Sequence, residues 1–192
     1  MPATCYNAQK AYIRDGMESD PAKEAIKMNL SHWFHDQLKA SADGFVWAVQ
    51  EVPAERRFIA PPAPLGEWNA ARHVFHMLYY EQKIALPSMR QWLGEPFKLT
   101  EEEYNEDAAW VDGQDLETML AQFQEIRAAQ IALLLKFNEA LWEEKREAVW
   151  GDVSLRWVVS KTYQHTAEHI HDVLRIALFW DMIARHLQQG EK

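Results

Sequence analysis

Two histidines one helical turn apart are the residues of this chain with the clearest chemical potential. His165 and His169 lie within residues 153–187, where apolar side chains recur at steps of three and four and so predict a helix. Both lie on its apolar stripe and should face the protein interior. The stripe consists of Leu155, Val158, Thr162, His165, His169, Val173, Ile176, Trp180 and Ile183.

Buried imidazoles at this spacing can hold one metal ion, at nitrogen-to-metal distances of about 2.0–2.1 Å. Their burial favours a ligand, because two neighbouring imidazoles in an apolar core are costly unless something satisfies them. The alternative is a structural pair that is hydrogen-bonded to Tyr163 or Thr162. The spacing alone does not decide between a metal site and such a pair.

Two familiar metal motifs do not fit this helix. A zincin needs a glutamate directly after its first histidine as general base, and Thr166 stands there. A di-iron bundle needs two Glu-x-x-His motifs, whereas Glu168 and His171 supply one copy on the polar face. We expect His171 to be solvated.

A third ligand has to come from another helix. His73 and His76 lie in a segment that is apolar on most of its circumference, so periodicity does not choose between them. His32 and His35 are further candidates on the first predicted helix.

Composition narrows the function classes. The 192 residues carry 20 Lys+Arg against 29 Asp+Glu, a formal net charge of −9, which argues against nucleic-acid binding. The single cysteine, Cys5, excludes a disulfide framework and a multi-thiolate metal site within one chain. Because neither a signal peptide nor a stretch of about 18 apolar residues is visible, we expect a cytoplasmic protein without membrane contact.

Turn residues divide the chain into an all-α fold. We expect four long helices, at about residues 21–52, 67–92, 114–147 and 153–187, with no strands. Asp20 and Pro21 form a helix-start signal, and Pro87 should kink the second helix. An acidic connector with one short helical turn would let the third helix run parallel to the second. Residues 1–20 should form a flexible segment before a single domain at 21–188.

The order of these features resembles the DinB/YfiT-like family. Gly66-Glu67-Trp68 follows a proline-rich turn, His76 lies eight residues past Trp68, and the last helix carries the His165/His169 pair. Glu81 fits an acidic position of the family, and Arg175 fits the run after the pair. The resemblance covers roughly residues 22–187. After His169 the chain reads Ile170-His171-Asp172 and so departs from the family's frequent His-His-Arg-Gly-Gln ending, as in the looser branch of the family.

The resemblance implies a four-helix bundle with a long connection between helices 2 and 3, and a divalent metal site. Imidazole ligands suit Zn, Ni or Fe. The implied chemistry is thiol S-transfer or thiol-assisted isomerisation with a low-molecular-weight thiol. His73 would be a partner of a ligand or a surface residue. The implied metal ligands are His76, His165 and His169, and the candidate proton-transfer or supporting groups are Glu81, Tyr80 and Asp172.

Two other classes of function stay open. One is a non-enzymatic, stress-related bundle that binds a metal or a small molecule. The other is a helical adaptor, which would present a large exposed apolar patch and show no dependence of stability on metal. Abundant aromatic residues and two-sided apolar helices would allow a homodimer, although the sequence does not fix one.

Overall fold

The computed structural model describes residues 29–100, 105–111 and 113–190. The fold is mostly helical, with one small hairpin. Its helices are α1 (Leu30–Glu51), α2 (Ala70–Tyr80), α3 (Leu86–Arg90), α4 (Glu106–Ala109), α5 (Leu116–Leu134) and α6 (Leu155–Gly190). Its strands are β1 (Lys145–Ala148) and β2 (Gly151–Ser154), and short 3-10 turns lie at Ala54–Arg56, Ala63–Leu65, Gln91–Leu93 and Glu139–Trp142.

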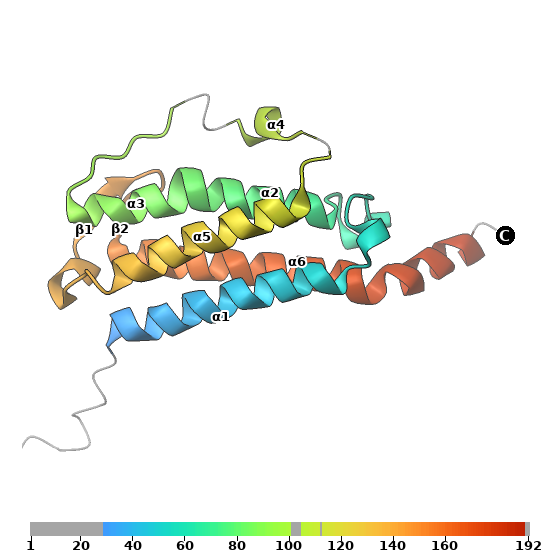
Figure 1. The fold of residues 1–192 in the computed structure, drawn as a ribbon, viewed down its shortest axis with the longest axis horizontal. Coiled ribbons are helices and arrows are strands. Elements are labelled where there is room, and N and C mark those ends of the chain that lie inside the picture. Colours follow the sequence, from blue (N-terminus) through green and yellow to red (C-terminus); the bar gives the residue numbers. More distant parts are fainter. Residues whose placement is uncertain (1–28, 101–104, 112, 191–192) are drawn as a thin grey trace, which may run out of the picture.

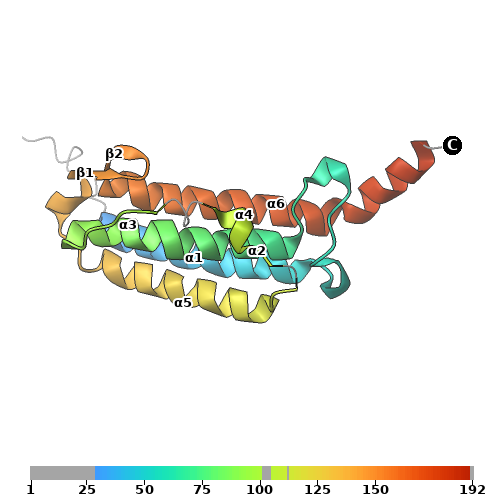
Figure 2. The same cartoon turned by 90° about the horizontal axis from the view of Figure 1, so that it is seen from above.

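Four long helical segments lie side by side: α1, α5, α6 and the continuous segment from α2 to α3 (Figures 1 and 2). The path of the chain in Figure 1 shows that α1 and α6 run in one direction and that α2–α3 and α5 run in the other. The long connector that carries α4 returns the chain for α5 to run parallel to α2. This confirms the predicted direction and the predicted short helical turn. The last turns of α6 project beyond the other helices (Figure 1).

Side-chain caps set the start of the main helices. The Asn29 side chain accepts from the His32 amide at the start of α1, Asn69 accepts from the Arg72 amide at α2, and Asp115 accepts from the Thr118 amide at α5. α1 therefore begins at Leu30, nine residues later than predicted. The predictions for Asp20-Pro21 and for the segment 1–20 lie outside the described residues.

The second helical segment contains a short π-helical stretch just before Pro87. Residues Glu81–Ala85 are π-helical, and the Leu86 amide donates to the Glu81 carbonyl, five residues back. Proline lacks the amide that would continue the α-helical pattern, so a local π-turn is one way for the helix to continue through it. Gly94, with φ 89°, then ends the segment as predicted.

Two predictions about residues 135–154 are wrong: the third helix does not continue to residue 147 but ends at Leu134, and two strands form where none was expected. The predicted break before the last helix is present at Gly151. The Asn138 side chain accepts from the Ala140 and Leu141 amides, which gives the backbone an alternative to the helix. Trp142 is buried and stacks on Phe34 at 5.4 Å between ring centroids. β1 and β2 pair antiparallel, and their residues, Lys-Arg-Glu-Ala and Gly-Asp-Val-Ser, lack the alternation of apolar and polar side chains that would predict a strand.

Two hydrophobic clusters fill the core. The first joins the C-terminal half of α1, α2, the start of α5 and the middle of α6, with Phe45 against Phe123 at 5.3 Å between centroids. The second joins the start of α1, α3, the end of α5 and the start of α6. Within the described ranges, no helix is long and apolar enough to cross a membrane.

Candidate metal centre

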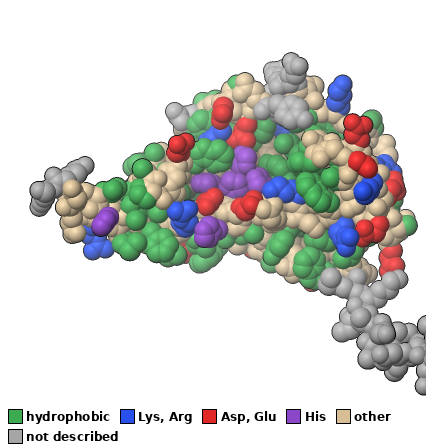
Figure 3. All heavy atoms as spheres, turned by 180° about the vertical axis from the view of Figure 1, so that it is seen from behind, with side chains coloured by type: hydrophobic (Ala, Val, Ile, Leu, Met, Phe, Trp, Pro, Cys, Tyr) green, Lys and Arg blue, Asp and Glu red, His purple; other side chains and the backbone are tan. Residues whose placement is uncertain are grey.

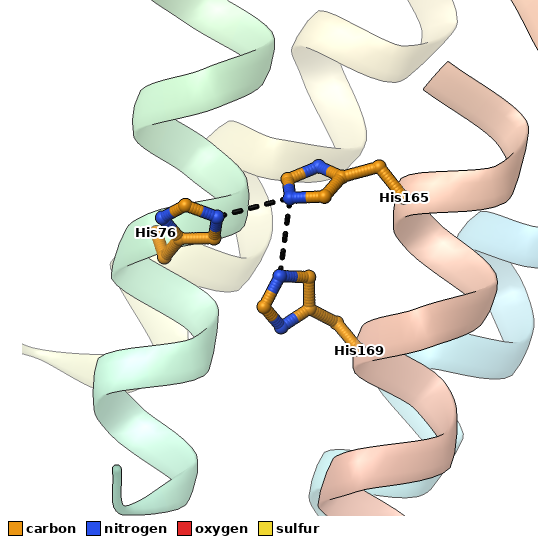
Figure 4. Close-up of side chains that lie close together, drawn as sticks. All are labelled: His76, His165 and His169. Carbon is orange, nitrogen blue, oxygen red and sulfur yellow. Dashed lines mark hydrogen bonds between the residues drawn. The ribbon is translucent and has the colours of Figure 1, made fainter. Parts of the chain in front are cut away.

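Three histidines from two helices point their rings at one another. His76 comes from α2, and His165 and His169 come from α6 (Figure 4). His165 Nε2 lies 3.0 Å from His76 Nε2 and 3.2 Å from His169 Nε2. One nitrogen of each ring lies within 4.8 Å of the others, so the three side chains could hold a metal ion together.

These separations suit nitrogen ligands of a single ion. With bonds of about 2.0–2.1 Å and ligand angles of about 90–110°, two nitrogens stand about 2.9–3.4 Å apart. The two Nε2 separations, 3.0 and 3.2 Å, fall inside that window. Three protein ligands also leave at least one coordination position for a substrate, as in catalytic zinc sites.

Hydrogen bonds alone do not satisfy the three rings. His76 Nδ1 lies 2.6 Å from Glu106 Oε2, so Nδ1 carries the proton and Nε2 of neutral His76 presents a lone pair. His165 Nε2 must then donate to His76, and its one proton cannot also serve His169. His165 Nδ1, meanwhile, is buried without a hydrogen-bond partner. A cation in the centre would instead accept a lone pair from every ring.

His73 is the partner of His169. Its Nδ1 lies 2.8 Å from His169 Nδ1, so one of the two nitrogens donates to the other. If His169 donates, its Nε2 keeps a lone pair towards His165 and His76, as a metal ligand requires. His73, His169 and Asp172 form a second group with ligand atoms within 4.8 Å. The 2.8 Å separation is typical of a hydrogen bond and short for two ligands of one metal.

Burial keeps the rings of His73, His165 and His169 uncharged at neutral pH. Desolvation is the main cause that lowers the pKa of His73 to about 4, of His165 to about 3 and of His169 to about 2. The neighbouring imidazoles lower these values further, since each would repel a second positive charge. Neutral imidazole is the form that binds a metal.

The carboxylate behind His76 is held by a cation. Arg72 Nη2 lies 2.9 Å from Glu106 Oε1 and 2.5 Å from Asp107 Oδ1. The Arg72 guanidinium is also 5.0 Å from the ring centroid of Trp68 and 5.3 Å from that of Trp110. These contacts dock α4 against α2, so that a residue of the acidic connector becomes part of the site.

The histidines form the floor of an open hollow of about 670 Å³. Figure 3 shows histidine side chains gathered on one face of the molecule, among acidic, basic and hydrophobic groups. Trp68 stacks almost parallel to His169, with 6.2 Å between ring centroids and 6° between planes. The lining residues are Trp68, His76, Gln164, His165, Ala167, Glu168, His169, His171 and Asp172.

The three candidate supporting residues take different places. Asp172 lines the hollow, with its carboxylate 3.9 Å from Arg175. Tyr80 is buried with its ring centroid 4.2 Å from that of His165, and burial raises the pKa of its hydroxyl. Glu81 is fully buried, and Arg127 and Gln130 bond to its two oxygens. Asp172 is therefore the one of the three on the wall of the hollow.

The remaining histidine predictions divide clearly. His73 is buried and is a partner of a ligand candidate, one of the two positions expected for it. His171 is exposed, which confirms that it is solvated. His32 is exposed, and His35 pairs with Asp36 at 2.9 Å, so neither belongs to the cluster.

Sequence reasoning did not find Glu106. It lies 30 residues from His76, among several acidic residues that we interpreted as a long connector with one short helical turn. Asn105 directly before it, whose side chain accepts from the Ala108 amide, is a helix-cap signal that could have marked the short helix. No signal in the sequence pairs that helix with His76.

A comparison with protein families identifies the family of this chain. The model of the DinB superfamily matches residues 37–173, a span that includes His76, His165 and His169. A search of curated proteins finds no match. The match covers more than half of the chain and includes both helices that supply the histidines, so the chain belongs to the DinB superfamily.

Proposed function

We propose that this protein is a metal-dependent enzyme that transfers a small thiol to an electrophile. The observation that carries the proposal is the convergence of three Nε2 atoms, 3.0 and 3.2 Å apart, at the floor of an open hollow. The ligands would be His76, His165 and His169. In the same proposal, the four long helical segments form a four-helix bundle of the DinB/YfiT-like type, a single domain at residues 21–188.

A divalent ion such as Zn, Ni or Fe in this position would supply a Lewis acid that lowers the pKa of a thiol. Neutral imidazoles leave the full positive charge on the ion, which favours an anionic sulfur. Trp68 provides an apolar wall beside His169 against which a substrate can pack. We assign proton transfer to Asp172, since it lines the hollow, and the positioning of His165 to Tyr80. Glu81 acts through its buried partners.

The thiol would come from the substrate and not from the protein. The chain has one cysteine, and no cysteine belongs to the metal-ligand groups among the described residues. We place the reaction in the cytoplasm, where small thiols stay reduced, and expect no nucleic-acid or membrane partner. A homodimer remains part of the proposal and would be measured by light scattering.

Turnover tests the proposal. Metal-loaded, untagged protein is incubated with a small thiol and an electrophile, and loss of thiol is compared with that for His165→Ala/His169→Ala. We expect a metal-dependent rate in the wild type that the variant lacks. Equal rates for the two proteins would refute the enzyme and favour a non-enzymatic metal- or small-molecule-binding bundle.

A further inference from the structure

A layer of buried polar side chains separates the two hydrophobic clusters of the core. We call it the Arg127 layer. Its members are at most 6% exposed and come from all four long helical segments. They are Ser41 of α1, Glu81 of the π-turn, Arg127 and Gln130 of α5, and Thr166 of α6.

Arg127 is the centre of this layer. Its Nη2 donates to Glu81 Oε1 at 2.5 Å and to Thr166 Oγ1 at 2.8 Å. Its Nη1 donates to Ser41 Oγ and to the Leu38 carbonyl, both at 3.2 Å. One guanidinium thus bonds to three other helical segments at a single level of the core.

The same level carries the candidate metal site. Thr166 lies in the chain between His165 and His169, and Glu81 lies five residues after His76 on the same continuous helical segment. Each of the two segments that supply ligands therefore also supplies a partner of Arg127. A shift of α2 along α6 that separates His76 from His165 would also break the Glu81–Arg127–Thr166 connection.

Stability does not account for such a layer. Removing a carboxylate and a guanidinium from water is costly, and apolar side chains of similar volume often give an equally stable or more stable core. Apolar surfaces also tolerate sliding, whereas a buried hydrogen-bonded pair is satisfied in one register, as buried polar residues in coiled coils illustrate. A register role thus explains polar groups that packing alone would not select.

We propose that the Arg127 layer fixes the axial register of α2 against α6 and so holds His76 opposite His165 at the separation that a metal requires. This inference rests on the proposed metal site. Glu81, Arg127 and Thr166 are then positioning residues that act through the histidines without touching the metal or a substrate. Their effect belongs to metal affinity and not to folding stability.

The main test is the double variant Glu81→Met/Arg127→Met. We expect the double variant to unfold cooperatively with a small loss of stability, because the buried Gln130 amide loses Glu81 as its acceptor, and to have a Zn²⁺ dissociation constant at least tenfold higher. Affinity is measured by competition with a chelator and stability by urea unfolding of the metal-free proteins. Arg56→Gln/Asp181→Asn, which removes a surface ion pair of 2.7 Å, is the control and should leave the affinity unchanged.

A milder variant keeps the inference testable if the double variant does not fold. Thr166→Val removes the hydroxyl that accepts from Arg127 while preserving side-chain shape. Thr162→Val is its match: the same residue type on the same helix, equally buried, whose hydroxyl donates to the Val158 carbonyl. We expect weaker Zn²⁺ binding in Thr166→Val than in Thr162→Val.

Three outcomes separate the two claims. Wild-type protein that binds no metal refutes the proposed function, and the inference falls with it. Wild-type protein that binds Zn²⁺ while a folded Glu81→Met/Arg127→Met binds it equally well overturns the inference alone. Where the double variant is unfolded, a Thr166→Val variant that binds Zn²⁺ as tightly as the wild type overturns it.

Discussion

Glu106 Oε2 lies 2.6 Å from Nδ1 of His76, a separation typical of a strong, charge-assisted hydrogen bond. Through this contact, a short helix in the connector fixes which nitrogen of His76 carries the proton. A carboxylate behind a metal-binding imidazole orients the ring and raises its basicity. The connector is therefore part of the candidate site, and this contact gives the first prediction.

Glu106→Gln should weaken metal binding about 10- to 100-fold, because a neutral amide oxygen is a poorer acceptor for the His76 proton. Asp107→Asn is the matched control, since Asp107 pairs with Arg72, is 91% exposed and does not contact His76. Competition with a chromogenic chelator gives both constants. A loss of affinity of the same size in both variants would show that the docking of α4, and not the proton on His76, is responsible.

His73→Leu should also raise the metal dissociation constant, by about tenfold or more, because His169 loses the acceptor for its Nδ1 proton. His171→Gln, which changes an exposed histidine of the same hollow, should have no such effect. Wild type and His73→Leu should each bind one metal. A wild type that binds two metals, one of which His73→Leu loses, would identify His73, His169 and Asp172 as a second metal site.

Stability of the metal-free protein should decrease as the pH falls from 7 to 5. The pKa of His73 is lowered to about 4, that of His165 to about 3 and that of His169 to about 2, against 6.5 without burial. The unfolded chain therefore binds more protons than the folded one in this range. The unfolding free energy consequently decreases as the pH is lowered, by up to ~4 kcal/mol per pH unit for the three groups together.

Urea unfolding at pH 7, 6 and 5 measures this slope. Carboxylates elsewhere in the chain also contribute to it, so the comparison is with a His73→Gln/His165→Gln/His169→Gln variant that cannot gain these protons. The slope should be smaller in the variant. Equal slopes would mean that the three rings are already protonated or exposed in the folded protein.

Phe123→Ala should destabilise the fold by about 3–5 kcal/mol, because it empties a fully buried site in the first hydrophobic cluster. Phe179→Ala, on the exposed end of α6 and 42% accessible, is the control and should cost much less. Urea unfolding of the two variants gives the comparison. Similar losses of unfolding free energy in the two variants would show that Phe123 is not part of the hydrophobic core.

Helical periodicity was enough to predict the general fold. It predicted the segments that form α1, α2–α3, α5 and α6, although it extended the third helix past Leu134. The stripe of α6 placed His169 in the interior with its neighbour His165 on the same face. The sequence also indicated the DinB family, through the spacing of Trp68 and His76 and that of His165 and His169. Local patterns were sufficient for the helices because apolar residues at steps of three and four form one continuous face only in a helix.

What the sequence could not show depends on contacts between distant residues. α5 ends at Leu134 because Asn138 caps another turn and Trp142 packs on Phe34, and neither event changes the local helical pattern. Only the contact between α4 and α2 distinguishes Glu106 from the other acidic residues of the connector. The choice between His73 and His76 likewise depends on the rotation of α2, which its nearly all-round apolar sequence does not encode.

X-ray absorption spectroscopy of Zn²⁺-loaded, untagged protein is the most direct test that His76, His165 and His169 bind one metal ion. We expect one bound zinc whose spectrum shows three imidazole nitrogens at about 2.0–2.1 Å. His76→Ala/His165→Ala/His169→Ala should lose this signal. A spectrum without imidazole scattering, or less than about 0.2 equivalents of any transition metal after reloading, would contradict the site.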